Sequence, residues 1–418
     1  MNSDMNNMIT PSDWIPENSI IKVIGVGGGG CNAVTYMYNQ GIQGCSFIVC
    51  NTDSQALGKS NVPVKIQLGK GLGAGTDPTA GRNAALEAQD IIAEKALDNG
   101  TKMLFITAGM GGGTGTGASP VIAKMAKDRG ILTVAVVTLP FSNEGNDSQA
   151  KAIDGIRELE KNVDSLLLIN NEKLYEHFGN ELIHNAFPKA DEVLATAVKG
   201  IIEIISKPGY MNVDFMDVTN MMRSSGMALM GCGVGTGEHR LEEAVKGAFE
   251  SPLLNDFDLK TAKNVLINIT AGKNEKGLMM SDLNKINKMI GEYTGNANKF
   301  KSGLIWEDDP DFGDKVQITA IATGFDMGKL GDITDINLGN LVILDKDFTY
   351  EKSSPAPGAE ISLPDTGGNI IKIGFNIAEH RRRFSYSPDD KPVLCVDPDD
   401  NRSELENTPA IRRAHKEK

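Results

Sequence analysis

The chain has 418 residues, which is too long for one ordinary domain core and predicts two or three domains. Its formal net charge of −13 argues against a general nucleic-acid binder, which would carry a basic face. The five cysteines form no CxxC pair, so neither a zinc site nor a disulfide framework is indicated. The polar N-terminus is not a signal peptide, and the longest apolar runs suit buried strands, so we expect a cytoplasmic protein without direct membrane insertion.

The first half of the chain alternates short apolar runs with helical patterns. Apolar and β-branched runs predict strands at Ile20–Val26, Ser46–Cys50, Met103–Ala108, Ile131–Val137 and Ser165–Ile169. Helical periodicity covers Ala33–Tyr38, Thr79–Leu97, Ala118–Asp128 and Ala150–Lys161. Continuous apolar strands separated by helices indicate a parallel sheet covered on both faces, in which ligands bind at the carboxyl ends of the strands.

The second half opens with a long helix predicted at Asp191–Lys207, which Pro208-Gly209 ends. A second α/β segment follows, with strands at Ala228–Cys232, Val265–Thr270, Leu304–Trp306 and Val316–Ala322, and helices at Arg240–Phe249 and Asp282–Ile290. Beyond about Phe325 the abundance of Pro, Gly, Asp and Ser predicts a flexible linker. The closing segment Leu405–Lys418 is apolar and basic, so its composition fits a docking peptide and a frayed tail equally well.

Three glycine-rich loops carry the chemistry. Gly25–Gly30 lies between a strand and a helix and matches GxGxxG, with Asp53 at the spacing of a ribose-binding carboxylate, so alone it fits a dinucleotide or another phosphate ligand. Gly109–Gly117 has the same context, and Gly69–Thr76 lies between the two. Dense glycines let N–H groups and a helix N-terminus converge on phosphate oxygens. Three such loops predict a polyphosphate site, and no GxxxxGK[ST] motif marks it as a Walker A site.

The run Gly111–Gly117, GGGTGTG, is the tubulin-family signature, and the chain from Ile20 to about Phe325 resembles FtsZ, the bacterial cell-division branch of that family. Supporting segments include IKVIGVGGGG, VCNTDSQAL, PGYMNVDFMDV and GCGVGTGEHRLEEA. The resemblance implies an α/β fold with a Rossmann-like parallel-sheet GTPase domain, a long central helix, a second smaller α/β domain and a disordered C-terminal tail. The implied parts are an N-terminal extension (1–18), a GTP-binding domain (19–188), the central helix (189–207), a C-terminal GTPase-activating domain (208–325), a linker (326–403) and a partner-binding tail peptide (404–418).

The resemblance also implies a GTP/GDP site, with Mg²⁺ bound through the phosphates and no metal site built from protein side chains. The implied phosphate contacts are Gly28, Gly29, Gly30, Cys31, Asn32, Gly73, Ala74, Gly75, Gly113, Thr114 and Gly115. Asn51 and Asp53 would lie near the nucleotide, Glu144 would bind the ribose, and Asn171, Phe187 and Asp191 would contact the base. A carboxylate at Asp191 would reject adenine, which lacks the donor pair of guanine. Ser148 stands where relatives carry a nucleotide-contacting arginine, whose charge a serine cannot supply.

The implied catalytic loop contains Asn212, Asp214 and Asp217. In relatives this loop enters the nucleotide pocket of the next subunit, where the aspartates orient the attacking water and Asn212 contacts the phosphates; positioning of this kind suits phosphoryl transfer. The competing interpretation is that Asp214 and Asp217 only cap a following helix, since Asp is a favoured N-cap.

A site shared between subunits implies head-to-tail contacts that do not close into a ring of chains, and therefore filaments. The resemblance thus implies a homopolymer that forms the cytoplasmic division ring at midcell. Membrane-tethering and regulatory proteins would bind the tail at Asn407–Arg413. Two alternatives stay open: a Rossmann-type NAD-dependent oxidoreductase, which would use only Gly25–Gly30 and Asp53, and a tubulin-like filament that partitions plasmids.

Overall fold

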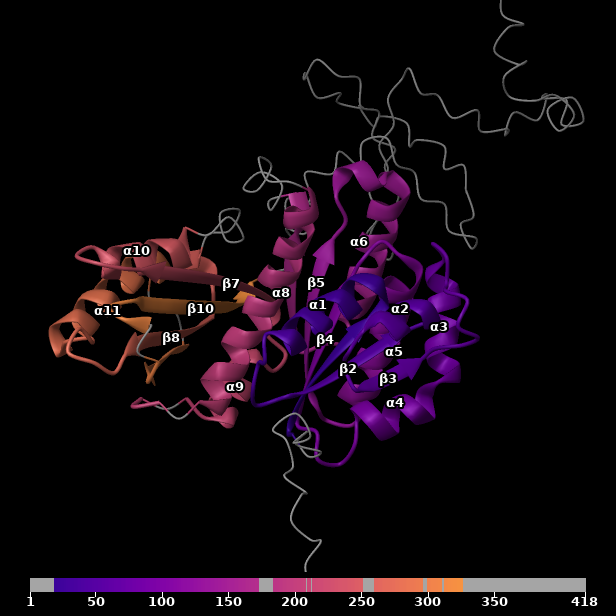
Figure 1. Cartoon of the computed structure of the whole chain (residues 1–418), viewed down its shortest axis with the longest axis horizontal. Coiled ribbons are helices and arrows are strands. Elements are labelled where there is room, and N and C mark those ends of the chain that lie inside the picture. Colours follow the sequence, from indigo (N-terminus) through magenta and orange to yellow (C-terminus); the bar gives the residue numbers. More distant parts are fainter. Residues whose placement is uncertain are drawn as a thin grey trace, which may run out of the picture. The chain divides into compact units, whose positions relative to one another are not determined.

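The computed structural model describes residues 19–172, 183–207, 209–211, 213–250, 259–295, 299–309 and 312–325, with only the backbone of 183–190. These residues all belong to one compact unit, in which ten strands form one sheet in the order β3-β2-β1-β4-β5-β6-β7-β10-β8-β9 (Figure 1). The strands are β1 (Ile21–Val26), β2 (Ser46–Asn51), β3 (Val64–Gln67), β4 (Met103–Gly109), β5 (Leu132–Leu139), β6 (Ser165–Asn170), β7 (Gly226–Gly235), β8 (Asn264–Gly272), β9 (Lys299–Glu307) and β10 (Val316–Phe325).

Helices cover both faces of this sheet. They are α1 (Gly27–Asn39), α2 (Ser54–Lys59), α3 (Pro78–Glu87), α4 (Gln89–Ala96), α5 (Gly113–Asp128), α6 (Asn146–Glu160), α8 (Ile183–Ser206), α9 (Phe215–Met222), α10 (Arg240–Phe249) and α11 (Met280–Thr294). One apolar cluster joins the sheet to α3–α6, α10 and α11, and a second joins it to α1, α2, α8 and α9. In β1, Ile24 and Val26 belong to the first cluster and Ile21 and Val23 to the second, because successive side chains of a strand point to opposite faces. The predicted doubly covered parallel sheet is confirmed.

The two predicted α/β segments share this single sheet. The seven strands β3, β2, β1, β4, β5, β6 and β7 lie side by side in this order and run parallel. The two halves are joined by a short β6–β7 pairing, in which Ser165 lies opposite Gly226 and Leu167 lies opposite Ala228. In the second half, β10 is antiparallel to both β7 and β8, and β8 is parallel to β9. Helix α8 packs against α1, β5 and β7, so it contacts elements of both halves (Figure 1).

Several element boundaries differ from the sequence prediction. Helix α8 begins at Ile183 rather than Asp191, and it contains Pro188, which removes only one intrahelical hydrogen bond near the helix start. The predicted helix Thr79–Leu97 is two helices, α3 and α4, that meet at Ala88, where no glycine or proline marks a break. Helices α1 and α5 begin inside the glycine loops, and the short elements β3 and α2 are absent from the prediction.

The N-terminal extension (1–18), the linker (326–403) and the tail peptide (404–418) lie outside the described residues, so the predicted boundaries of the chain's parts stay predictions. Within the residues that are described, no helix is both long and apolar enough to cross a membrane.

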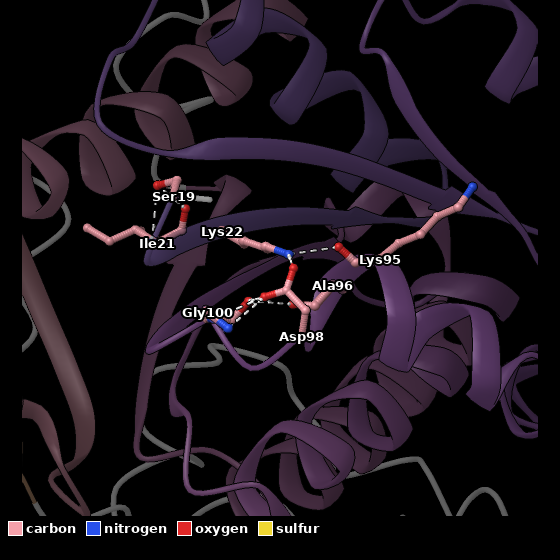
Figure 2. A network of polar contacts seen from close by, with 8 residues as sticks. Ser19, Ile21, Lys22, Lys95, Ala96, Asp98 and Gly100 are labelled. Atoms are coloured by element: carbon pink, nitrogen blue, oxygen red, sulfur yellow. Dashed lines mark hydrogen bonds and ion pairs between the residues drawn. The ribbon is translucent and has the colours of Figure 1, made fainter. Parts of the chain in front are cut away.

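A buried lysine makes several polar contacts at the amino-terminal end of β1, which is the end of the strand away from the glycine loops. The side chain of Lys22 in β1 is only 5% exposed, and its Nζ donates to the Lys95 carbonyl at 3.0 Å and to the Asp98 carboxylate (Figure 2). The Asp98 carboxylate also accepts hydrogen bonds from the backbone N–H groups of Gly100 and Thr101 and from the Thr101 hydroxyl. Desolvation raises the pKa of Asp98, but the hydrogen bonds from Lys22 and Thr101 outweigh it, and the net pKa is lowered.

We expect removal of the carboxylate to cost more stability than removal of the lysine. Asp98→Ala should lower the free energy of unfolding by about 1–3 kcal/mol, because it leaves a buried ammonium without its counter-charge. Lys22→Met should cost less, since Asp98 is 40% exposed and keeps its contacts with Thr101. Because the folded pKa of Asp98 is depressed, its contribution exists above the unfolded pKa and disappears as the pH falls through the folded value. Urea unfolding at several pH values measures both effects, and a larger loss for Lys22→Met would contradict this account.

Glycines also let helices α3 and α5 pack at backbone contact. A Cβ at Gly117 in α5 would overlap the Pro78 carbonyl oxygen and lie 2.8 Å from the Arg82 nitrogen in α3. In return, a Cβ at Gly81 in α3 would lie 2.9 Å from the Thr114 Cα in α5. No side chain larger than hydrogen fits at either position unless the helices separate.

The same substitution should therefore have opposite effects at two helical glycines. Gly117→Ala should destabilise the protein by about 1–3 kcal/mol through overpacking. Gly291→Ala in α11 meets no atom within 4 Å, so it should stabilise the protein by about 0.5–1 kcal/mol through higher helix propensity. Thermal unfolding of both variants tests this difference in sign, and equal shifts would show that the α3–α5 approach does not matter.

Candidate functional site

The predicted nucleotide residues follow strands of the parallel half of the sheet. Gly27 follows β1, Asn51 ends β2, Gly109 ends β4, Pro140 follows β5 and Asn171 follows β6. The carboxyl ends of parallel strands lie along the same edge of a sheet, so the topology brings these segments to one edge.

Two helices begin at this edge without a side-chain cap. The N-cap residues of α1 and α5 are Val26 and Gly112, and neither makes a side-chain capping hydrogen bond with any residue that the structure describes. In contrast, Asp53 caps α2 and Asp77 caps α3. The first four N–H groups of a helix have no intrahelical partner and carry a partial positive charge. The N-termini of α1 and α5 therefore offer amide donors to an anion, with Gly28, Gly29 and Asn32 of α1 exposed.

The three glycine loops meet through backbone contacts. A Cβ at Gly27 would lie only 2.8 Å from the Gly115 nitrogen, so the first loop packs directly against the signature loop Gly109–Gly117. A Cβ at Gly113 would lie 2.6 Å from the Gly75 carbonyl oxygen and 3.0 Å from the Ala74 Cβ, which brings in the third loop. Gly73 donates its N–H to the Thr52 carbonyl at 2.9 Å. The structure thus assembles all three loops around one edge, where a side chain at Gly27 or Gly113 would force the neighbouring loop to move.

Thr52 lies in this assembly and is absent from the predicted site residues. The hydroxyl groups of Thr52 and Thr114 form a buried hydrogen bond of 2.6 Å, which joins the segment after β2 to the start of α5. Thr116 is likewise engaged, since its Oγ1 accepts the Gly111 N–H at 2.8 Å. A threonine after a strand is too common for the sequence to single out Thr52.

Two predicted ligand residues have structural roles. Asp53 Oδ1 accepts the N–H groups of Gln55 and Ala56 at 2.8 and 3.2 Å, so it caps α2. The Cys31 thiol is buried and donates to the carbonyls of Gly25 and Cys50, and burial raises its pKa to about 12. Cys31 is therefore a neutral packing residue inside α1 rather than a reactive thiolate.

The segment after β5 contributes two further predicted residues. Glu144 is exposed, and its Oε1 accepts the Phe141 N–H at 2.9 Å, which shapes the turn before α6. Ser148 is half-buried in the first turn of α6, where its carbonyl oxygen lies 3.0 Å from the place a Cβ on Gly111 would occupy. The first turn of α6 therefore adjoins the signature loop even though Ser148 brings no charge there.

Asn171 and Asp191 have polar groups that nothing in the described chain satisfies. Asn171 is buried, and its Oδ1 has no hydrogen-bond partner among the described residues. Burial raises the pKa of the Asp191 carboxyl to about 6, with no compensating partner in the same part of the chain. Buried polar groups are normally paired, so these two side chains fit a polar ligand. The side chain of Phe187 lies outside the described residues, although its backbone belongs to α8.

Asp214 and Asp217 form a capping box at the start of α9. Asp214 Oδ1 accepts the Asp217 N–H at 2.7 Å, and Asp217 Oδ2 accepts the Asp214 N–H at 3.3 Å. Asp217 Oδ2 also lies 2.8 Å from Lys301 Nζ, a partner that the sequence does not indicate. The structure thus shows the capping geometry, with Asp214 still exposed; Asn212 lies outside the described residues.

Helix α8 separates Asp214 and Asp217 from the carboxyl ends of the parallel strands, where the predicted nucleotide residues lie. It follows β6, whose carboxyl end lies at that edge, and β7 then runs parallel to β6, so the chain must return to the opposite edge first. With 24 residues at about 1.5 Å each, α8 is about 36 Å long. From Asp191 to the end of α8 the helix is still about 23 Å long, and the capping box lies beyond that end, so the two sets of residues cannot meet within one chain.

Known families match both halves of the chain. Residues 20–179 match the GTPase domain of the Tubulin/FtsZ family, and residues 226–326 match the C-terminal domain of the FtsZ family. Proteins named Cell division protein FtsZ from Pseudomonas putida and Porphyromonas gingivalis are each 46% identical, over 352 and 413 residues. The first alignment covers 82% of this chain and 85% of the relative, and the second covers 94% and 85%.

Solved structures support the same family assignment. An FtsZ dimer from M. jannaschii is 39% identical and superposes with a TM-score of 0.66, covering 73% of this chain and 88% of that chain. CetZ2 from Haloferax volcanii, with a TM-score of 0.63 at 19% identity, supports the fold alone. The chain therefore belongs to the Tubulin/FtsZ family and is a GTPase of that family.

Proposed function

We propose that this GTPase assembles head to tail into filaments and hydrolyses GTP at the contact between consecutive subunits. The observation that carries the proposal is the separation along α8, which leaves the glycine loops and the Asp214–Asp217 loop at opposite edges of one sheet. A head-to-tail contact would bring the second edge of one subunit onto the first edge of the next. Repetition of such a contact without closure gives a filament.

In the proposed nucleotide pocket, the amide groups at the N-termini of α1 and α5 bind the phosphates. Glu144 binds the ribose, and Asn171, Phe187 and Asp191 contact the guanine. The unpartnered Asn171 Oδ1 and the desolvated Asp191 carboxylate support a ligand rich in N–H donors. The described residues contain no group of three or more His, Cys, Asp or Glu side chains that could hold a metal ion. We propose that a bound Mg²⁺ takes its ligands largely from the nucleotide phosphates and water.

In the proposed catalytic step, Asp214 and Asp217 of the adjoining subunit orient water for attack on the γ-phosphate, and Asn212 contacts the phosphates. Gly73–Gly75 lies beside the signature loop and is placed to sense hydrolysis. Such a mechanism works through positioning and needs no covalent intermediate. The capping box supports it, since backbone hydrogen bonds hold both carboxylates in one orientation.

We also propose that the filaments form the division ring at midcell. Support comes from the relatives named for cell division, which match up to 94% of the chain and favour this role over plasmid partition. The tail Asn407–Arg413 would recruit membrane-tethering and regulatory division proteins through the apolar Ile411 and its neighbouring arginines. That segment lies outside the described residues.

Two substitutions at one position separate catalysis from capping. Asparagine caps a helix as well as aspartate does, whereas alanine costs about 1 kcal/mol at an N-cap. Asp214→Asn should therefore keep the α9 cap and the assembly threshold but lower turnover about a hundredfold, as expected for loss of a water-orienting carboxylate. Asp214→Ala should be equally slow. GTP hydrolysis per sedimented subunit is the measurement.

If only Asp214→Ala is slow, the role of Asp214 is capping and the catalytic proposal fails. A wild-type rate per total protein that stays constant down to the lowest concentrations would also contradict a site shared between subunits. Retained GTP binding in both variants is the control.

Guanine selectivity should depend on pH through Asp191. Asp191 accepts from both guanine donors, N1–H and the amino group, only when it is ionised, and with a pKa of about 6 it is protonated as the pH falls through that value. The ratio of GDP affinity to ADP affinity should thus fall about fourfold between about pH 7.5 and pH 5.5, a direct consequence of this titration. Taking the ratio cancels titration of the phosphates.

Asp191→Asn should lower the GDP/ADP ratio at neutral pH and remove its pH dependence. Equilibrium binding with fluorescent analogues of both nucleotides measures it. An unchanged GDP/ADP ratio in the variant would show that another group selects guanine over adenine.

A further inference from the structure

The segment that leads into the catalytic loop is fastened to β9, the outer strand of the sheet. Tyr210 donates its N–H to the Leu304 carbonyl at 2.8 Å, and Leu304 donates its N–H to the Met211 carbonyl at 3.1 Å. These bonds form an isolated antiparallel bridge on the free edge of β9. The backbone before the catalytic carboxylates is therefore registered against β9.

One residue earlier on β9, a glycine lets the loop lie close. A Cβ at Gly303 would lie 3.2 Å from Val213 Cγ2 and 3.4 Å from the Met211 carbonyl oxygen. Val213 is itself buried in the apolar cluster with α8 and α9. The loop is thus packed against β9 immediately before Asp214.

Lys301 provides the third contact, and it acts on a carboxylate. It lies two residues before Gly303, hence on the same face of the strand, and its Nζ lies 2.8 Å from Asp217 Oδ2. Asp217 Oδ2 also accepts the Asp214 N–H, so one oxygen is held by a cation and a backbone amide from different elements. An ion pair between side chains that are 41% and 30% exposed contributes little to stability, so its effect should be sought elsewhere.

We propose that Lys301 is a positioning residue for hydrolysis, which fixes the orientation of the Asp217 carboxylate that this loop presents to the adjoining subunit. The proposal rests on the catalytic role of Asp217 proposed above. The hydrogen bond from Lys301 also lowers the pKa of Asp217, so the pair keeps the carboxylate in its ionised form. Lys301 touches neither nucleotide nor water in this role and acts through Asp217.

The first test compares lysine variants of the full-length chain. Lys301→Met should lower GTP turnover per sedimented subunit about threefold to tenfold, since a loosened carboxylate spends less time in the productive orientation. The KM for GTP should not change, because the glycine loops proposed to bind GTP lie at the other edge, and counting turnover per sedimented subunit separates the rate from any change in the assembly threshold. Lys301→Arg should restore most of the rate. Lys299→Met is the matched control: Lys299 is exposed on the same face of β9, its side chain forms no hydrogen bond or ion pair with the described residues, and the substitution should be neutral.

The second test combines substitutions. If Lys301 acts through Asp217, the double variant Lys301→Met/Asp217→Asn should be no slower than Asp217→Asn alone. Multiplied effects would instead show that Lys301 acts independently, either on the neighbouring subunit or on general structure, and would overturn the proposal. Lys301→Gln repeats the comparison with a polar side chain of similar length, should Lys301→Met raise the assembly threshold.

The catalytic role of Asp217 and the positioning role of Lys301 are refuted by different results. Normal turnover in Asp217→Asn would refute the catalytic role of Asp217 and, with it, any role for Lys301 through that residue. Slow turnover in Asp217→Asn with normal turnover in Lys301→Met would leave the catalytic role intact and refute only the positioning role.

Discussion

The close backbone approach of the glycine loops is the constraint on which the site depends. Gly27 lies against Gly115 and Gly113 lies against Gly75, so three loops from distant parts of the sequence share one edge of the sheet. The N-cap residues Val26 and Gly112 have no polar side chain, so α1 and α5 begin without side-chain caps. In the proposed pocket, backbone amides bind the phosphates, which would explain how a chain with a net charge of −13 can hold a polyphosphate.

The length of α8 is the second constraint on the proposed mechanism, because it keeps the proposed base contacts and the proposed catalytic loop at opposite edges of one sheet. In the proposed mechanism, an isolated subunit would hold nucleotide without the carboxylates needed to hydrolyse it, and turnover would be tied to assembly. Capping and catalysis are compatible at Asp214 and Asp217. The hydrogen bonds that start α9, together with the pairing of the loop on β9, hold both carboxylates in one orientation, as the proposed role in an adjoining subunit would need.

Local sequence patterns predicted most of the secondary structure and the nature of the site. Apolar strands, helical periodicity and glycine clusters depend on neighbouring residues, so they located nine of the ten strands and the three loops. They were weakest where the deciding interactions are not local. Helix α8 begins before Asp191, and the break at Ala88 has no glycine or proline to mark it. Asp53 fits a ribose ligand by spacing yet caps α2, because helix capping and ligand binding favour the same residue type.

The sequence by itself thus determined the glycine loops, the alternation that makes a parallel sheet, the candidate base-reading residues and the family. Only the tertiary structure decided that both halves share one sheet, that Thr52 bonds Thr114, and that Lys301 meets Asp217. These contacts join residues far apart in the chain, and threonines and lysines are too common on strands for either to be recognised as a partner in advance. A local pattern fixes which way a side chain points; the packing of distant elements decides what it meets.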